Sequence, residues 1–153
     1  MTSTRTVQTV DELKALVGQE LGVGDWLDLT QERVNQFADV TGDHQWIHVD
    51  VERATASPLA HGYLTLSLIP LLGESRRGVK ISLPYKQVFN YGLNRARFIT
   101  PVKVGARVRM RTMLQGLEEI GPGVIQLTNI QTIEIEGSDR PAMVAEMLVR
   151  FYV

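Results

Sequence analysis

The sequence contains no cysteine among its 153 residues. This absence excludes disulfide bonds, thiolate catalysis and cysteine-based zinc sites, and it fits a reducing compartment. The sequence also lacks a basic excess, since Lys and Arg total 16 against 17 Asp and Glu. Domains that bind nucleic acids normally carry surplus positive charge. We therefore expect no nucleic-acid partner.

Long hydrophobic runs are absent as well. The most apolar stretch, residues 64–72, is far shorter than the ~20 residues that a bilayer span requires. Thr65, Ser67 and Pro70 also interrupt it. Residues 1–9 are polar, so we expect no secretory signal there. These features predict a cytoplasmic protein without a membrane partner.

Apolar residues make up 44% of the chain and charged residues 22%, which is ordinary for a globular protein. The length fits one domain spanning residues 1–153. Near the start, Thr9 and Glu12 have the spacing of a capping box, and Gly18 favours a helix end. We expect a short helix over about residues 10–18, attached to the domain as an appendage.

Two further helices are predicted before the strands begin. Thr30 is a suitable N-cap and Gly42 a suitable end for a helix between them. Residues 43–60 show no clean period and are predicted to be irregular. The segment 62–72 is apolar nearly all the way round, as expected of an enclosed helix, and Pro70 should kink or shorten it.

From Lys86 onward the apolar residues recur every second position, which is typical of strands with one buried face. Turns are expected at residues 121–123 and 137–141, and the last strand at 143–153. Small helices, one enclosed helix and then long antiparallel strands indicate the α+β class. The pattern favours a sheet curled around the enclosed helix.

All three histidines fall within residues 44–61. A general acid–base site needs a group that titrates near neutral pH and a carboxylate beside it, and His48 and Asp43 could supply these. A polar cluster on a surface loop is the alternative. His44 and His48 have the spacing of a helical zinc site, but the glutamate of that motif is missing, so we expect no metal.

His61 and Gly62 stand where the enclosed helix begins. The first N–H groups of a helix lack internal partners and can hold a developing oxyanion. Gly62 could equally serve only as a cap. Further along, Asn90, Tyr91 and Asn94 could bind a polar ligand or satisfy a turn.

Together these residues resemble the MaoC-like dehydratase family, which includes the (R)-specific enoyl-CoA hydratases and the NodN-type proteins. The resemblance rests on four segments, namely Thr41-Gly42-Asp43, His48, His61-Gly62 and the stretch from Asn90 to Phe98. The last segment is similar to the NodN-type branch in particular. The resemblance runs from about Val23 to the C-terminus.

The resemblance implies a hot-dog fold, in which a curved antiparallel sheet wraps around one long central helix, and a homodimer. The implied reaction is the reversible hydration of a trans-2-enoyl thioester to an (R)-3-hydroxyacyl thioester. Asp43 and His48 would activate water, and the Gly62 N–H would stabilise the thioester oxygen. No cofactor is implied, because CoA or an acyl carrier is part of the substrate. The other implied substrate-binding residues are Gln45, His61, Ser67, Asn90, Tyr91 and Asn94.

The chain departs from the family pattern at two places. Gln45-Trp46 replaces the usual Asn-Pro, and Pro70 stands where some hydratases have a helix serine, with Ser67 one turn earlier. The connection from Asp50 to His61 is also short. Two other functions therefore remain open, a hot-dog acyl-CoA thioesterase and a non-catalytic acyl-binding or dehydratase subunit.

Overall fold

A computed structural model describes residues 4–55 and 57–153. Within these residues the helices are short, namely α1 (Val10–Lys14), α2 (Gln31–Thr41), α3 (Trp46–Val49), α4 (Gly62–Ser67) and α5 (Ile69–Glu74). The first four strands are short too: β1 (Arg5–Val7), β2 (Glu20–Val23), β3 (Leu27–Asp28) and β4 (Arg77–Ile81). Four long strands follow: β5 (Gln87–Phe98), β6 (Arg107–Gly121), β7 (Val124–Ile135) and β8 (Met143–Tyr152).

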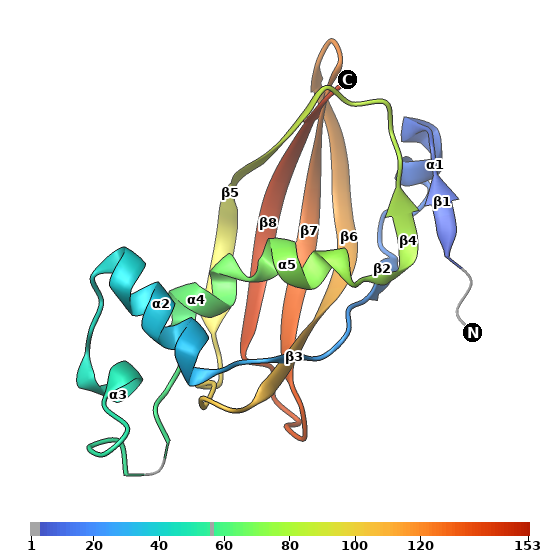
Figure 1. Ribbon diagram of the computed structural model, residues 1–153. Coiled ribbons are helices and arrows are strands. Elements are labelled where there is room, and N and C mark those ends of the chain that lie inside the picture. Colours follow the sequence, from blue (N-terminus) through green and yellow to red (C-terminus); the bar gives the residue numbers. More distant parts are fainter. Residues whose placement is uncertain (1–3, 56) are drawn as a thin grey trace.

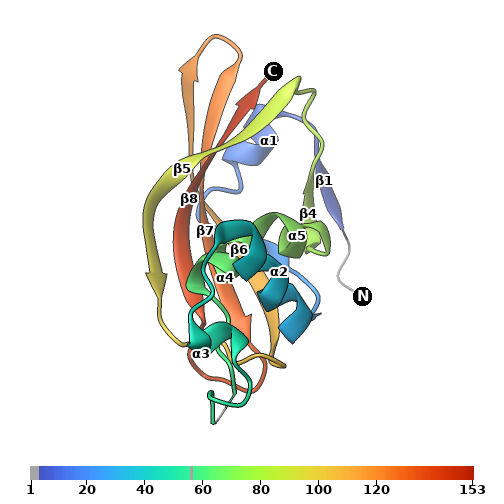
Figure 2. The same ribbon diagram turned by 60° about the vertical axis from the view of Figure 1, so that its left-hand side comes forward.

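The strands form one sheet in the order β1-β4-β2-β6-β7-β8-β5, with β3 paired to β6. The sheet bends around α4 and α5, which lie across its concave face (Figures 1 and 2). The predicted curved sheet around a central helix is confirmed. The sheet is mixed rather than purely antiparallel, because β1 runs parallel to β4. No strand is predicted from the sequence pattern at Arg5–Val7.

The period-two pattern sets which face of the long strands is buried. In β6 the side chains of Val108, Met110, Thr112 and Leu114 are buried, as their alternation predicts. Their partners in β7 follow in antiparallel register, with Val108 opposite Ile135 and Met110 opposite Ile133. Because successive side chains in a strand point to opposite faces, the arginines between them face the convex side.

The central helix is divided into α4 and α5 at Leu68, two residues before Pro70. Proline removes a backbone donor and its ring clashes with the preceding turn, so the predicted kink is observed here. Both halves contribute to the main core, in which Leu64, Leu68, Ile69 and Leu72 pack against Met143 and other sheet residues. Burying each of these side chains contributes about 1.5–3 kcal/mol.

A second apolar cluster lies beneath α1. The predicted capping box is present, because the Glu12 N–H donates to Thr9 and the Glu12 carboxylate accepts from the Thr9 N–H. The helix ends at Lys14, before Gly18, yet Leu13 and Leu16 are buried with Leu21. This helix therefore closes one end of the core.

The predicted caps of α2 are confirmed. The Thr30 hydroxyl accepts the Arg33 N–H, and Gly42 ends the helix with a φ of 79°. The segment 43–60 is not wholly irregular, since Trp46–Val49 forms the single turn α3. None of the helices that the structure describes has the length and apolar character needed to span a membrane.

Candidate active site

His48 lies on α3 with its side chain turned inward. It is buried, and its Nδ1–H donates to the Leu59 carbonyl at 2.5 Å. The Gln31 side chain donates to the His48 carbonyl at 2.9 Å, which ties α3 to α2. Because Nδ1 carries the donated proton, Nε2 keeps a free lone pair. The bond to Leu59 therefore leaves Nε2 as the nitrogen of His48 that can accept a proton.

His61 immediately precedes α4 and is 3% exposed. Its Nε2–H donates to the Asp43 carbonyl at 2.9 Å. The ring packs between Phe37, at a centroid distance of 5.0 Å, and His48, at 3.8 Å and 24°. His61 therefore links α4 to both the Asp43 backbone and the His48 ring.

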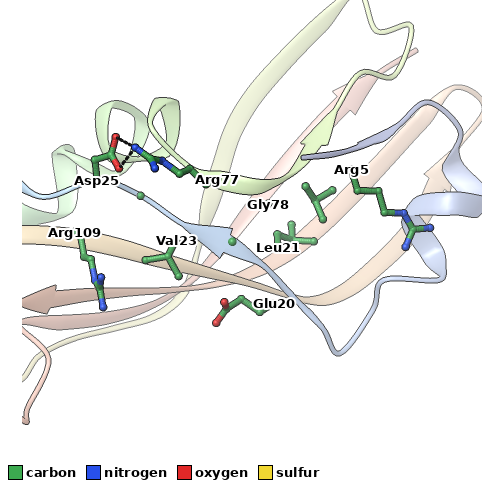
Figure 3. A pocket seen from close by; sticks show the side chains of 11 residues that line it. Arg5, Glu20, Leu21, Val23, Asp25, Arg77, Gly78 and Arg109 are labelled. Carbon is green, nitrogen blue, oxygen red and sulfur yellow. Dashed lines mark hydrogen bonds and ion pairs between the residues drawn. The ribbon is translucent and has the colours of Figure 1, made fainter. Parts of the chain in front are cut away.

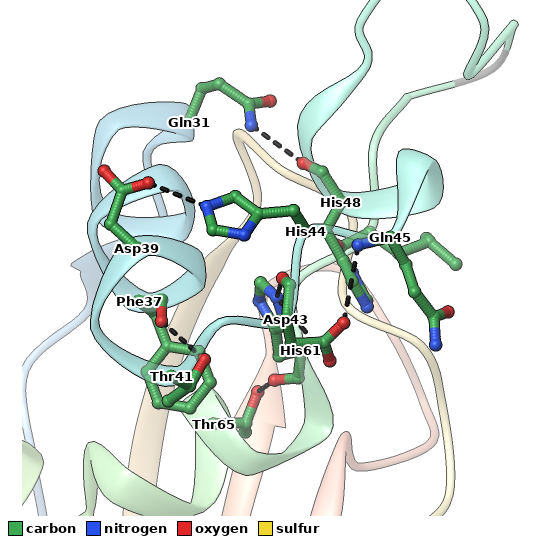
Figure 4. A network of polar contacts seen from close by, with 11 residues as sticks. Gln31, Phe37, Asp39, Thr41, Asp43, His44, Gln45, His48, His61 and Thr65 are labelled. Carbon is green, nitrogen blue, oxygen red and sulfur yellow. Dashed lines mark hydrogen bonds and ion pairs between the residues drawn. The ribbon is translucent and has the colours of Figure 1, made fainter.

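Asp43 follows the left-handed Gly42 at the end of α2, where the chain turns toward α3. Its side chain accepts the Gln45 N–H at 3.4 Å, and its second oxygen lies 4.0 Å from His61 Nε2. One carboxylate oxygen of Asp43 and one ring nitrogen each of His48 and His61 lie within 4.8 Å of one another. The three residues converge in Figure 4.

The three side chains also make up a donor set that could surround a cation. However, His48 and His61 are nearly parallel, so their in-plane lone pairs do not converge on one point. Acid–base chemistry fits this arrangement better than metal ligation. His44 does not join the cluster, because it is exposed and pairs with Asp39 at 2.8 Å (Figure 4).

A cavity of about 270 Å³ opens beside His48. Its walls are mostly apolar, and the residues that line it are His48, Leu59, Ala60, Gly62, Thr65, Phe98, Thr100, Pro101, Val102 and Ala142. No acceptor in the described chain takes the Gly62 N–H. A Cβ at Gly62 would lie 3.1 Å from the Phe98 ring, so glycine permits the close approach of this ring.

Sequence reasoning did not single out Thr65 and Thr100 as members of this cavity. Thr65 lies one turn after His61 on the predicted helix, so helical spacing could have indicated it. Thr100 comes from the loop after β5, and only the fold brings it there. Its Oγ1 is buried without a partner in the described chain.

The other predicted residues are distributed more widely. Gln45 is exposed and contributes its backbone N–H to Asp43. Ser67 and Asn90 line a separate hollow of about 220 Å³ farther along the central helix.

Tyr91 and Asn94 lie on the opposite face of β5, where Arg150 covers the Tyr91 ring at 3.2 Å and the Asn94 amide donates to Glu146 at 2.8 Å. Substrate roles for Ser67, Asn90, Tyr91 and Asn94 stay predictions.

A hollow of about 480 Å³ lies between β2 and β4 (Figure 3). Arg77 pairs there with Asp25 at 3.0 Å, and Glu20 pairs with Arg111. Both carboxylates that line this hollow are therefore engaged in ion pairs. The cavity beside His48 is the better candidate for chemistry.

The comparison with known families agrees with this fold and site. Residues 12–134 match the model of the MaoC like domain. The match covers most of the chain, and the protein belongs to the MaoC-like dehydratase family. The hot-dog architecture expected from the sequence is thereby confirmed.

Curated relatives extend over nearly the whole chain. The chain is 49% identical to 3-hydroxyacyl-thioester dehydratase Z of Mycobacterium tuberculosis, over 96% of this chain and 98% of that protein. It is 41% identical to Nodulation protein N of Rhizobium leguminosarum, over 90% and 87% of the two chains. Among solved structures, the (R)-hydratase of A. caviae matches with a TM-score of 0.62 and 26% identity, over 84% of this chain and 96% of that one.

Proposed function

We propose that the protein is an (R)-specific enoyl thioester hydratase, which also catalyses the reverse dehydration of 3-hydroxyacyl thioesters. Family membership and the hydratase and dehydratase names of its relatives support this reaction class. CoA or an acyl carrier forms the handle of the substrate. The described residues supply the acid–base groups and the amide donor that this reaction uses. The proposed reaction requires no cofactor.

The observation that carries the proposal is the separation between Asp43 and His48. A carboxylate oxygen of Asp43 and a ring nitrogen of His48 lie within 4.8 Å of each other, close enough for one water to bridge them. A water oxygen about 2.8 Å from each group would make a normal hydrogen bond to both. The site is therefore built to hold and polarise one water molecule.

The proton balance follows from the tautomer of His48. Its Nδ1–H is committed to Leu59, so Nε2 is the nitrogen that can take a proton from water. The water oxygen then bonds to C3, the C2=C3 double bond becomes single, and the proton that His48 took from the water is delivered to C2. Asp43 holds the water and supports the positive charge that develops on the imidazole. Such acid–base groups contribute roughly 10²–10⁴-fold to the rate.

The developing negative charge lies on the thioester oxygen. Gly62 presents an N–H without an acceptor at the edge of the same cavity. A donor placed at this position stabilises the enolate more than the ground-state carbonyl, an effect of about 10²–10³-fold. The apolar walls exclude bulk water and strengthen this interaction.

The test uses Asp43→Asn and His48→Gln, with His44→Gln as a matched control because His44 is exposed and outside the cluster. We expect each of the first two variants to lose at least a hundredfold in crotonyl-CoA hydration, while the control keeps wild-type activity. Circular dichroism checks that all three fold. Unchanged rates in Asp43→Asn and His48→Gln would reject the proposal.

The alternatives are read from the same samples. Release of free thiol from saturated acyl-CoA would identify a thioesterase. Binding of acyl-CoA without turnover, or turnover only after a second chain is added, would identify a non-catalytic subunit.

We also propose a homodimer formed through β5. This strand is last in the sheet order, and Val88, Phe89, Tyr91, Leu93 and Phe98 expose apolar surface along it. An unpaired edge of this length and character is a site for strand pairing, and a two-fold axis would cover it. The cytoplasmic location stays a prediction from the sequence, supported by the absence of cysteine.

A further inference from the structure

Three hollows follow one another along the seam between the central helices and β8. Ala142 lines the cavity beside His48, Met147 lines the second hollow, and Val149 and Phe151 line the third. From Ala142 to Val149 the extended strand spans about 23 Å. The third hollow, which we call the distal hollow, thus lies at the far end of a row that begins at the candidate catalytic residues.

The distal hollow has a volume of about 600 Å³, and part of its wall is apolar, formed by Val79, Ile81, Leu127, Val149 and Phe151. Arg76, from the segment after α5, and Asn129, from β7, are among its polar lining residues. Neither residue takes part in the catalytic cluster.

Arg76 carries a positive charge that the described chain does not balance. Its guanidinium donates to the Val79 carbonyl at 2.9 Å, but its Nε is buried without a partner. No carboxylate of the described residues lies within ion-pair distance of it. Burial lowers the pKa of the Arg76 guanidinium, because water is removed from the charged form. A half-buried cation left in this state is costly unless an anion binds it.

Asn129 is an independent sign of a ligand. It occupies an inward position of β7 between Leu114 and Met147 on the neighbouring strands, where the pattern calls for an apolar residue. It is only 7% exposed, and its amide makes no hydrogen bond to the described residues, so its Nδ2 is available to donate to an anion. Gln131, two residues later, is buried too but accepts from Thr112 at 2.7 Å. Asn129 alone of this pair is unsatisfied within the described chain.

The charges around the hollow favour an anion. Glu74 and Lys80 are exposed and line the same hollow, and their opposite charges offset each other. The positive charge of Arg76 is therefore left without a counter-charge. A planar guanidinium matches the two oxygens of a carboxylate, and an asparagine amide can donate to the same group.

We propose that the distal hollow binds a carboxylate at the far end of a long acyl chain, so that ω-carboxyacyl thioesters are substrates. This inference rests on the proposed hydratase function and names its substrate class. The thioester lies beside His48, the chain follows the seam, and its terminal carboxylate reaches Arg76 and Asn129.

The test compares trans-2-enoyl-CoA substrates of increasing length that end either in a methyl group or in a carboxylate. In the wild-type protein, kcat/KM should be higher for the carboxylate-terminated substrate than for the methyl-terminated one only when the acyl chain is long enough to reach Arg76. Arg76→Met should lower kcat/KM for the long ω-carboxy substrate by about 10–100-fold. The same variant should leave crotonyl-CoA and the methyl-terminated chain unchanged.

Lys80→Met is the matched control, because it removes an exposed cation from the rim of the same hollow, and it should change none of these values. Asn129→Leu should lower kcat/KM for the long ω-carboxy substrate selectively, as Arg76→Met does. Thermal unfolding of each variant confirms that it folds.

The proposal would be overturned if the wild-type protein preferred the carboxylate-terminated substrate at no chain length. It would also be overturned if Arg76→Met lowered kcat/KM equally for the carboxylate-terminated and methyl-terminated substrates. A free long-chain dicarboxylate that binds through Arg76 without competing with crotonyl-CoA would instead assign the hollow to a separate effector, which also overturns it. If crotonyl-CoA is not hydrated at all, the hydratase function fails. Calorimetric binding of ω-carboxyacyl-CoA to wild type and Arg76→Met then still tests the distal hollow by itself.

Discussion

The His48 and His61 rings lie face to face, with their centroids 3.8 Å apart and their planes 24° from parallel. Two positively charged rings at this distance would repel each other strongly. In the proposed mechanism, therefore, only one of the two rings takes a proton from water. His48 has the free nitrogen for this role, whereas Nε2 of His61 is bonded to the Asp43 carbonyl.

His61 is expected to act as a positioning residue. His61→Phe keeps an aromatic ring against His48 but removes the N–H that holds the Asp43 carbonyl. We expect kcat to fall about fivefold, since one hydrogen bond of this kind is worth about 1 kcal/mol. His61→Gln retains a donor and should recover much of the loss. Equal rates in His61→Phe and wild type would show that the bond does not position Asp43.

The small size of Gly62 is expected to matter for the oxyanion. In Gly62→Ala the new Cβ would lie 3.1 Å from the Phe98 ring, so either the ring or the start of α4 must shift. Steady-state kinetics should show at least a tenfold lower kcat with little loss of folding stability. The double variant Gly62→Ala/Phe98→Leu relieves the contact, and partial recovery would confirm the steric cause.

The exposed pair of His44 and Asp39 should give a pH-dependent stability. The hydrogen bond that His44 Nε2 donates to the Asp39 carboxylate, at 2.8 Å, raises the pKa of His44 above its ordinary value. A raised pKa means that the pair stabilises the fold below about pH 6.5, and that this contribution disappears as pH rises through the folded-state value.

Asp39→Asn should therefore lower Tm at about pH 5.5 and have little effect at about pH 9. In the variant, the pKa of His44 measured by NMR titration should return toward its ordinary value. A Tm difference that grows with pH would contradict the assignment.

The exposed edge of β5 should control the oligomeric state. Leu93→Lys places a charge in the middle of the edge strand, where Leu93 is 43% exposed. Light scattering should show monomers where the wild type forms dimers, because charged edge residues oppose strand pairing. Val40→Lys is the control, since Val40 is 86% exposed on α2. A wild-type protein at monomer mass would contradict the proposed dimer.

The sequence by itself determined the features that depend on neighbouring residues. The caps of α1 and α2, the break before Pro70 and the buried faces of β6 and β7 were all predicted. They follow from local hydrogen bonding and from the fixed repeat of helix and strand. The motif from Asp43 to Gly62 likewise indicates the catalytic candidates from the sequence alone.

Only the tertiary structure decided which of these side chains meet. A bulge in β5 after Asn90 changes the parity of the strand, so that Asn90 faces the inner hollow and Asn94 faces the convex side. The stack of His48 on His61 requires α3 to fold against the start of α4. Arg76 and Asn129 are far apart in sequence and share the distal hollow only because the sheet curves around α5. Such contacts arise from long-range packing, which a local pattern does not record.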